Sequence, residues 1–161
     1  MRLLALAALL PLFALADGHA SVTVSDHEHL SFEDGHAYFM AFDGFGVMAL
    51  ATAPLSGGTW AHGDSAFTYV EVRVFEGIHE GEIALGGGAN LTVQHWPTAG
   101  AEADGPTFFT ESGTLTFTEV SDSLATGTIT AQLLGYADDG AESRAALEAT
   151  FRARPGNIPA P

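Results

Sequence analysis

The chain has 161 residues, and its 20 acidic side chains against five arginines and no lysine give a formal net charge of −15. Nucleic acids and anionic membrane surfaces are bound by clustered cations, so this composition argues against both as partners. The chain also has no cysteine, which excludes disulfides, thiol catalysis and cysteine-ligated zinc.

The first sixteen residues have the features of a secretory signal peptide. Arg2 carries a positive charge, residues 3–15 are an apolar run, and Ala14-Leu15-Ala16 matches an A-x-A cleavage site. The run is shorter than the ~20 apolar residues of a membrane-spanning helix. We therefore expect residues 1–16 to be removed and the protein to be exported, either to a periplasm or as a secreted protein. We expect no transmembrane helix in the mature chain.

The remaining sequence is divided by turn signals into short runs in which apolar and polar residues alternate. Asp-Gly pairs, for example at 34–35 and 43–44, suit tight hairpin turns. Alternation with a period of two is typical of half-buried strands, and many such runs at this spacing predict a barrel or a sandwich. In chain order, the expected strands cover residues 20–24, 29–32, 36–42, 45–52, 67–75, 82–85, 90–96, 114–118, 128–133 and 147–152.

The domain prediction follows from these runs. After the signal peptide, residues 17–153 are expected to form a single all-β domain, an antiparallel β-barrel or β-sandwich. Residues 154–161 contain three prolines and are expected to be a disordered tail.

Two of the predicted strands have polar faces that carry aromatic side chains. One sets Tyr69, Glu71 and Arg73 opposite three valines, and another places Trp96 on its polar face and His95 on its apolar face. Tyr69 and Trp96 are therefore expected to be exposed, where they would offer a binding face. His95 is expected to be a hydrogen-bonded core residue.

Glycine–threonine pairs recur at the starts of the last predicted strands. They occur in Ser112-Gly113-Thr114-Leu115 and in Ala125-Thr126-Gly127-Thr128-Ile129, while Leu147-Glu148-Ala149-Thr150-Phe151 has alanine in place of the glycine. This last third of the chain resembles small exported bacterial β-proteins of unassigned function, which carry similar SGTL, GTI and GTF patterns. The resemblance implies an exported β-fold and no particular activity.

One polar stretch carries the pattern of a transition-metal site. On a strand, His27, His29 and Glu33 lie an even number of residues apart and share one face. Two imidazoles and a carboxylate suit zinc, iron or copper. The spacing His-x-His-x3-Glu resembles the first motif of the cupin family, small β-barrels with an internal metal, although Ser21 and Met40 replace two cupin glycines. The resemblance implies a cupin-like metalloprotein.

Strand geometry offers an alternative interpretation of the same stretch. In a straight strand, His29 and Glu33 lie about 13 Å apart at ~3.3 Å per residue, too far for one ion without a bend. A hairpin at Asp34-Gly35 would moreover place Glu33 opposite His36. The stretch then reads as a solvated polar edge that protects a strand from mispairing.

A second metal hypothesis concerns the start of the mature chain. Cleavage after Ala16 exposes Asp17-Gly18-His19, whose amine, two amides and imidazole can wrap Cu(II) or Ni(II) in a square plane. This sequence resembles the amino-terminal copper- and nickel-binding motif. The candidate metal ligands are therefore His27, His29, Glu33 and His19, for one ion of copper, nickel, zinc or iron.

The sequence offers little support for an enzyme. It contains no G-x-S-x-G nucleophile motif, no calcium-binding loop of the EF-hand type and no glycine-rich loop before a helix. We expect an exported, soluble and non-catalytic β-domain with a binding or structural role, whose partner is a small molecule or another protein. The alternative is the metalloprotein described above.

Overall fold

The computed structural model describes residues 18–98, 101–103, 105–137 and 140–161, so the predicted signal peptide 1–16 and Asp17 lie outside the described residues. The all-β prediction is confirmed, because most of the described chain is strand and the helical element in it is a single 3-10 turn, η1 (Glu28–Leu30). The strands are β1 (His19–Val24), β2 (Phe32–Phe42), β3 (Phe45–Ala51), β4 (Leu55–Ser56), β5 (Thr59–Trp60), β6 (Phe67–Val74), β7 (Gly81–Leu85), β8 (Ala89–Trp96), β9 (Thr107–Ser121), β10 (Leu124–Tyr136) and β11 (Glu142–Pro155).

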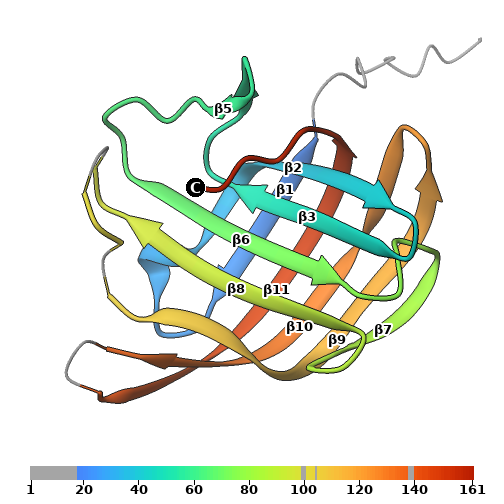
Figure 1. The fold of residues 1–161 in the computed structure, drawn as a ribbon. Helices are drawn as coiled ribbons and strands as arrows, with labels where there is room; N and C mark the ends of the chain where they lie inside the picture. The colour runs from blue at the N-terminus through green and yellow to red at the C-terminus, as the bar shows by residue number, and fades with distance from the viewer. Residues whose placement is uncertain (1–17, 99–100, 104, 138–139) are drawn as a thin grey trace, which may run out of the picture.

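The main sheet closes on itself. Its strands pair in the order β1-β11-β10-β9-β7-β8-β6-β3-β2, and β1 pairs with β2 to complete the circuit (Figure 1). Most neighbours are antiparallel, but β11 pairs with β2 and β7 with β8 in parallel. The sheet is therefore mixed, whereas the sequence predicted a purely antiparallel one. The short strands β4 and β5 form a separate hairpin.

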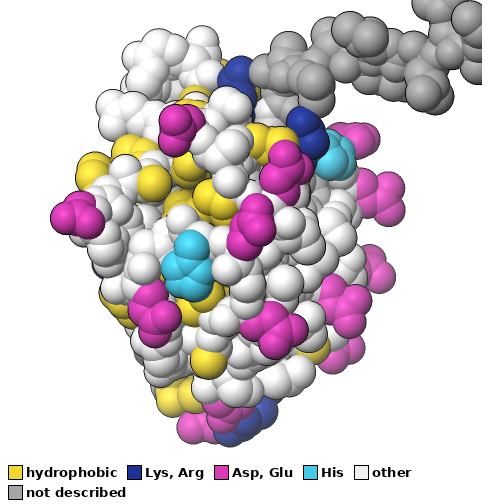
Figure 2. Space-filling view, turned by 90° about the vertical axis from the view of Figure 1, so that its right-hand side faces the viewer, with side chains coloured by type: hydrophobic (Ala, Val, Ile, Leu, Met, Phe, Trp, Pro, Cys, Tyr) yellow, Lys and Arg dark blue, Asp and Glu magenta, His cyan; other side chains and the backbone are white. Residues whose placement is uncertain are grey.

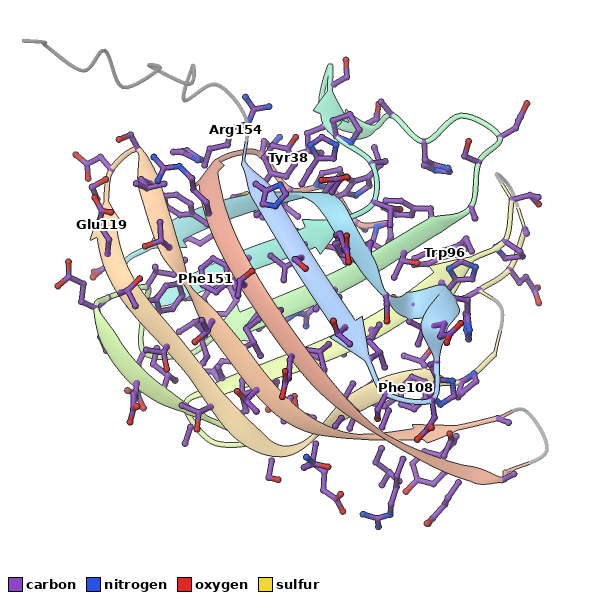
Figure 3. The ribbon with its side chains drawn as sticks, turned by 180° about the vertical axis from the view of Figure 1, so that it is seen from behind. Tyr38, Trp96, Phe108, Glu119, Phe151 and Arg154 are labelled. Carbon is purple, nitrogen blue, oxygen red and sulfur yellow. The ribbon has the colours of Figure 1, made fainter. Side chains whose placement is uncertain are left out.

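The space enclosed by the sheet is a packed hydrophobic core. Alternate residues of each strand point inward, as the sequence pattern predicted for Val70, Val72 and Val74, each of which is fully buried. Phe151 lies inside the barrel in Figure 3, and its ring meets that of Phe117 edge-on, with 5.7 Å between the centroids. Because fully burying one such side chain contributes about 1.5–3 kcal/mol, this core accounts for most of the hydrophobic stabilisation.

The recurrent glycine–threonine pairs mark irregular positions in the long strands. Gly113 has a φ of 145°, and the pairing of β9 with β10 shifts register before Gly127. A Cβ atom at Gly127 would overlap the carbonyl oxygen of Thr116 and approach the ring of Phe151. Glycine is required here because two backbones and an aromatic ring meet at one point.

A second cluster of buried side chains lies on the outer surface of the sheet. This outer aromatic cluster consists of Tyr38, Ala49, Ala51, Ala53, Trp60, Phe67, Tyr69 and Ile158. Its residues come from β2, β3, the connection between β3 and β4, β5, β6 and the C-terminal segment. The alanines of β3 allow the large rings to lie close to the sheet.

The C-terminal segment covers this cluster and differs from the predicted disordered tail. Residues 154–161 begin in β11, which continues to Pro155, and Ile158 is only 9 % exposed. The indole N–H of Trp60 donates a hydrogen bond to the carbonyl oxygen of Pro159 at 3.4 Å. Prolines are compatible with this extended path because a segment outside the sheet needs few backbone N–H donors.

The hairpin predicted at Asp34-Gly35 is not present in the structure. Asp34 and Gly35 lie inside β2, where Gly35 pairs with Ala20 of β1 and a Cβ atom would collide with the ring of Phe32. The glycine therefore serves close packing and not a turn. The chain turns instead at Asp43-Gly44, between β2 and β3, as was also predicted.

Candidate functional site

The most developed surface feature lies on the outer face of β6 and β8. These antiparallel strands place Tyr69 opposite Gln94, Glu71 opposite Thr92, and Arg73 opposite Asn90. Directly paired residues point to the same side of a sheet, so three cross-strand pairs form one polar floor. Three ordered rows of donors and acceptors therefore face outward from a rigid part of the barrel.

The charged groups on this floor are held in a fixed arrangement. The Arg73 guanidinium donates from Nε to Oε1 of Glu71 at 2.6 Å, and the Tyr69 hydroxyl donates to Oε2 of Glu71 at 3.3 Å. The Glu71 side chain is 16 % exposed and that of Arg73 is 60 % exposed. Burial, reinforced by the neighbouring Glu71 carboxylate, raises the pKa of the Tyr69 phenol. Tyr69 is therefore a neutral donor at physiological pH.

Aromatic rings and the C-terminal segment wall this floor and make it a groove. Thr92 pairs with Phe109 of β9, so the Phe109 ring continues the central row, and Phe75 lies at the end of β6. The two rings are 48 % and 46 % exposed. Ala160 and Pro161 form part of the wall, and the enclosed volume is about 530 Å³. This outer groove has the size of a small-molecule site.

The predicted metal ligands His27 and His29 lie at one end of the barrel. Their ring centroids are 5.8 Å apart, and that of His29 is 5.3 Å from that of His95, which gives a histidine row. The Nδ1 atom of His95 lies 2.9 Å from the hydroxyl oxygen of buried Thr68. The hydrogen bond expected for His95 is present, but the residue is half-buried and lies outside the core clusters, and its contact with His29 was not predicted. The ring of His27 also packs edge-on against Phe108, with centroids 4.8 Å apart.

Glu33 does not complete a three-ligand metal centre with these histidines. His29 belongs to η1 and not to a strand, so the even spacing from His27 to Glu33 does not place them on one face. Glu33 is exposed on β2. Among the residues that the structure describes, no group of three or more histidine, aspartate or glutamate side chains is placed to hold one metal ion.

His19, the other candidate ligand, is the first residue of β1 and pairs with Arg152 of β11. Gly18 precedes it and packs so closely that a Cβ atom would overlap the carbonyl oxygen of Ala37. Wrapping Cu(II) or Ni(II) needs the amides of Gly18 and His19, so chelation would compete with the first pairing of β1. Asp17, which would supply the amine, lies outside the described residues.

Only some of the residues of the outer groove could be predicted from the sequence. The alternation predicted that Glu71 and Arg73 face outward, but it held no signal for the register that pairs β6 with β8. Phe109 falls outside every predicted strand, because β9 begins seven residues earlier than expected. Tyr69 is only 1 % exposed, so its predicted exposure was wrong. The outer aromatic cluster covers its ring.

Comparisons with known proteins give no family for this chain. No protein-family model, no curated protein and no solved structure matches it. Within the described part of the chain there is no apolar helix of membrane-spanning length. A functional proposal therefore depends on the surface chemistry of the chain itself.

Proposed function

We propose that this protein is an exported, non-catalytic binding domain that holds an uncharged, polyhydroxylated ligand, such as an oligosaccharide, in the outer groove. The observation that carries the proposal is the combination of three polar cross-strand pairs with two half-exposed phenyl rings in one groove of about 530 Å³. Export is part of the proposal, and it is supported by the signal-peptide features of residues 1–16.

The chemistry of the floor favours a ligand that both donates and accepts hydrogen bonds. Asn90 and Gln94 each offer an amide with two donors and an acceptor, and the Glu71–Arg73 pair offers a carboxylate beside a guanidinium. A sugar presents hydroxyl groups at its edge and C–H groups on its faces. The hydroxyls match the polar floor, while the exposed phenyl rings supply apolar surface for the C–H face.

Charge argues for a neutral ligand in this groove. The net charge of −15 repels anions over the whole surface. A cationic ligand would gain little binding free energy from the Glu71 carboxylate, because that carboxylate is already paired with Arg73 at 2.6 Å. Neither effect acts on a neutral ligand, so the groove would select among neutral ligands by their shape and hydrogen bonding.

A glycan array carrying neutral and anionic glycans tests the proposal. Wild-type protein should bind a subset of the neutral glycans, and Phe109→Ala or Glu71→Gln should weaken that binding about tenfold, as expected when a central contact is lost. Tyr136→Ala and Glu148→Gln are matched controls, because Tyr136 is 50 % exposed and Glu148 is an exposed acid on β11. The proposal is contradicted if the protein binds only anionic glycans, if it binds no glycan, or if the control variants lose as much affinity as the groove variants.

A second candidate function is metal binding by His29 with one neighbouring histidine, and the ring-centroid distances of 5.8 Å to His27 and 5.3 Å to His95 favour it. Imidazole suits zinc, copper and nickel. Calorimetric titration with Zn(II), Cu(II) and Ni(II) should then show one site that His29→Ala removes and that His79→Ala, an exposed turn histidine, retains. If His29→Ala still shows the heat of metal binding, this candidate is contradicted. If His19→Ala abolishes that heat, the metal binds at the N-terminal motif instead.

A further inference from the structure

The end of the barrel opposite the histidine row has a large apolar hollow that the outer groove does not include. It has a volume of about 820 Å³, and Phe39, Phe42, Ile78, Val120 and Pro155 are among its lining residues. Figure 2 looks onto this end, where apolar side chains gather in the upper part of the face with acidic side chains around them. We call this feature the end hollow.

Local packing explains why the end hollow is apolar. Phe42 ends β2 at the tight turn to β3 and is 57 % exposed, the highest value among the large hydrophobic side chains that stand out from the described surface. Its ring stacks on that of Phe45 with 6.1 Å between centroids. Ile78 lies so close to Gly46 that a Cβ atom there would be 2.5 Å from it. The floor is therefore formed by apolar side chains that contact one another, and the exposed Phe42 ring offers apolar surface to a partner.

Acidic side chains surround the end hollow. Asp122 lines it, Asp43 follows Phe42 in the turn, and the Glu80 carboxylate accepts a hydrogen bond from the backbone N–H of Val120 at 3.4 Å. Glu119, adjacent to Val120, lies at this end in Figure 3. These four carboxylates are contributed by three separate turns and the end of β9.

The chain has few basic side chains to set against this rim, five arginines against 20 acidic residues. Figure 2 shows basic side chains in the upper part and at the bottom of this face, with acidic side chains spread over most of it. Arg154 is next to Pro155, but its guanidinium lies over the ring of Tyr38, 5.1 Å from the centroid, and donates to the Tyr38 hydroxyl at 3.4 Å. The hollow therefore combines an apolar floor with a negative rim on a chain of net charge −15.

From this arrangement we infer that the end hollow docks a cationic, amphipathic peptide segment of another protein. An apolar side chain of that segment fills the space beside Phe42 and Ile78, and flanking lysines or arginines pair with Asp122, Glu80 and Asp43. Charge complementarity favours this partner over an acidic protein or an anionic membrane, both of which the rim repels. The inference is independent of the ligand in the outer groove.

Fluorescence anisotropy with a labelled peptide built of repeats of LKKLLKK tests this inference at physiological salt. The double variant Phe42→Ser/Asp122→Asn should raise the dissociation constant about tenfold, because it removes the anchor contact and one ion pair. Tyr136→Ser/Glu148→Gln is the matched control, since it removes a ring of similar exposure and one negative charge on another surface. It should leave the dissociation constant within about twofold. Unchanged thermal unfolding of both variants would show that they are folded.

Two further peptides separate specific docking from simple charge attraction. A version with serine in place of leucine keeps the charge and loses the anchor, and a version with glutamate in place of lysine reverses the charge. Both should bind at least about tenfold more weakly than the original peptide. The inference is overturned if the original peptide does not bind, if the serine peptide binds equally well, or if the control variant loses as much affinity as the hollow variant.

Discussion

At the scale of single residues, glycines show how the sequence encodes close packing. Gly127 faces the carbonyl oxygen of Thr116 and the ring of Phe151, so Gly127→Ala should destabilise the protein by about 1–3 kcal/mol or more through overpacking. Gly87→Ala is the control, because a Cβ atom there would meet only the Ala84 carbonyl oxygen at 4.0 Å. Urea unfolding measures both changes. Equal stability of the two variants would contradict this role of Gly127.

The buried phenol of Tyr69 predicts a pH dependence of stability. Burial raises its pKa above the ordinary value of 10.0, so above pH 10 the unfolded chain loses a proton that the folded chain keeps. The stabilisation from this group is therefore complete below pH 10 and declines as the pH rises, by at most about 1.4 kcal/mol per pH unit. Tyr69→Phe should show a shallower decline in unfolding free energy above pH 10. Parallel curves for the two proteins would refute this.

At the scale of elements, the C-terminal segment links the outer aromatic cluster to the outer groove. Ile158 is buried in the cluster, while Ala160 and Pro161 wall the groove. Ile158→Ser should remove roughly 2 kcal/mol of apolar burial and promote local detachment of the segment. The Gly156 amide, which donates to the Phe39 carbonyl at 3.0 Å, should then exchange at least about tenfold faster in hydrogen-exchange NMR, whereas Ile158→Val should have little effect. Unaltered exchange in Ile158→Ser would show that the burial of Ile158 does not hold the segment.

The same elements show what could be read from the sequence. Alternation revealed the β class and the inward valines of β6, because a strand with one buried face must alternate. The C-terminal segment carries no alternation, and its order depends on Trp60 and Met40, which are distant in sequence: the Ile158 N–H lies 3.3 Å from the Met40 sulfur. Contacts of this kind arise only once the sheet has closed. Two members of the histidine row, His27 and His29, were predicted as candidate ligands from the sequence. The contact of His95 with His29 could not be predicted, because it depends on the pairing of β8 with β6.

At the scale of the whole molecule, closure of the sheet separates an apolar interior from outer surfaces that carry the polar and charged side chains. The interior is filled by apolar side chains, so the enclosed space is a structural core, and the outer groove and the end hollow lie on the surface around it. The groove is built on two strands whose inward valines are fully buried, so its polar rows are held on a rigid support. Ligand binding is therefore expected to cause little backbone movement in β6 and β8.

Sugar binding in the outer groove is tested most directly by an amide NMR titration of the full chain with neutral hexasaccharides of the malto, cello, xylo and chito series. At least one of them should shift the amide signals of Glu71, Asn90 and Phe109, while the signals of the end hollow around Phe42 and Asp122 stay in place. If all four leave the groove signals unchanged, or shift only signals elsewhere, the assignment of the outer groove as a site for neutral sugars is contradicted.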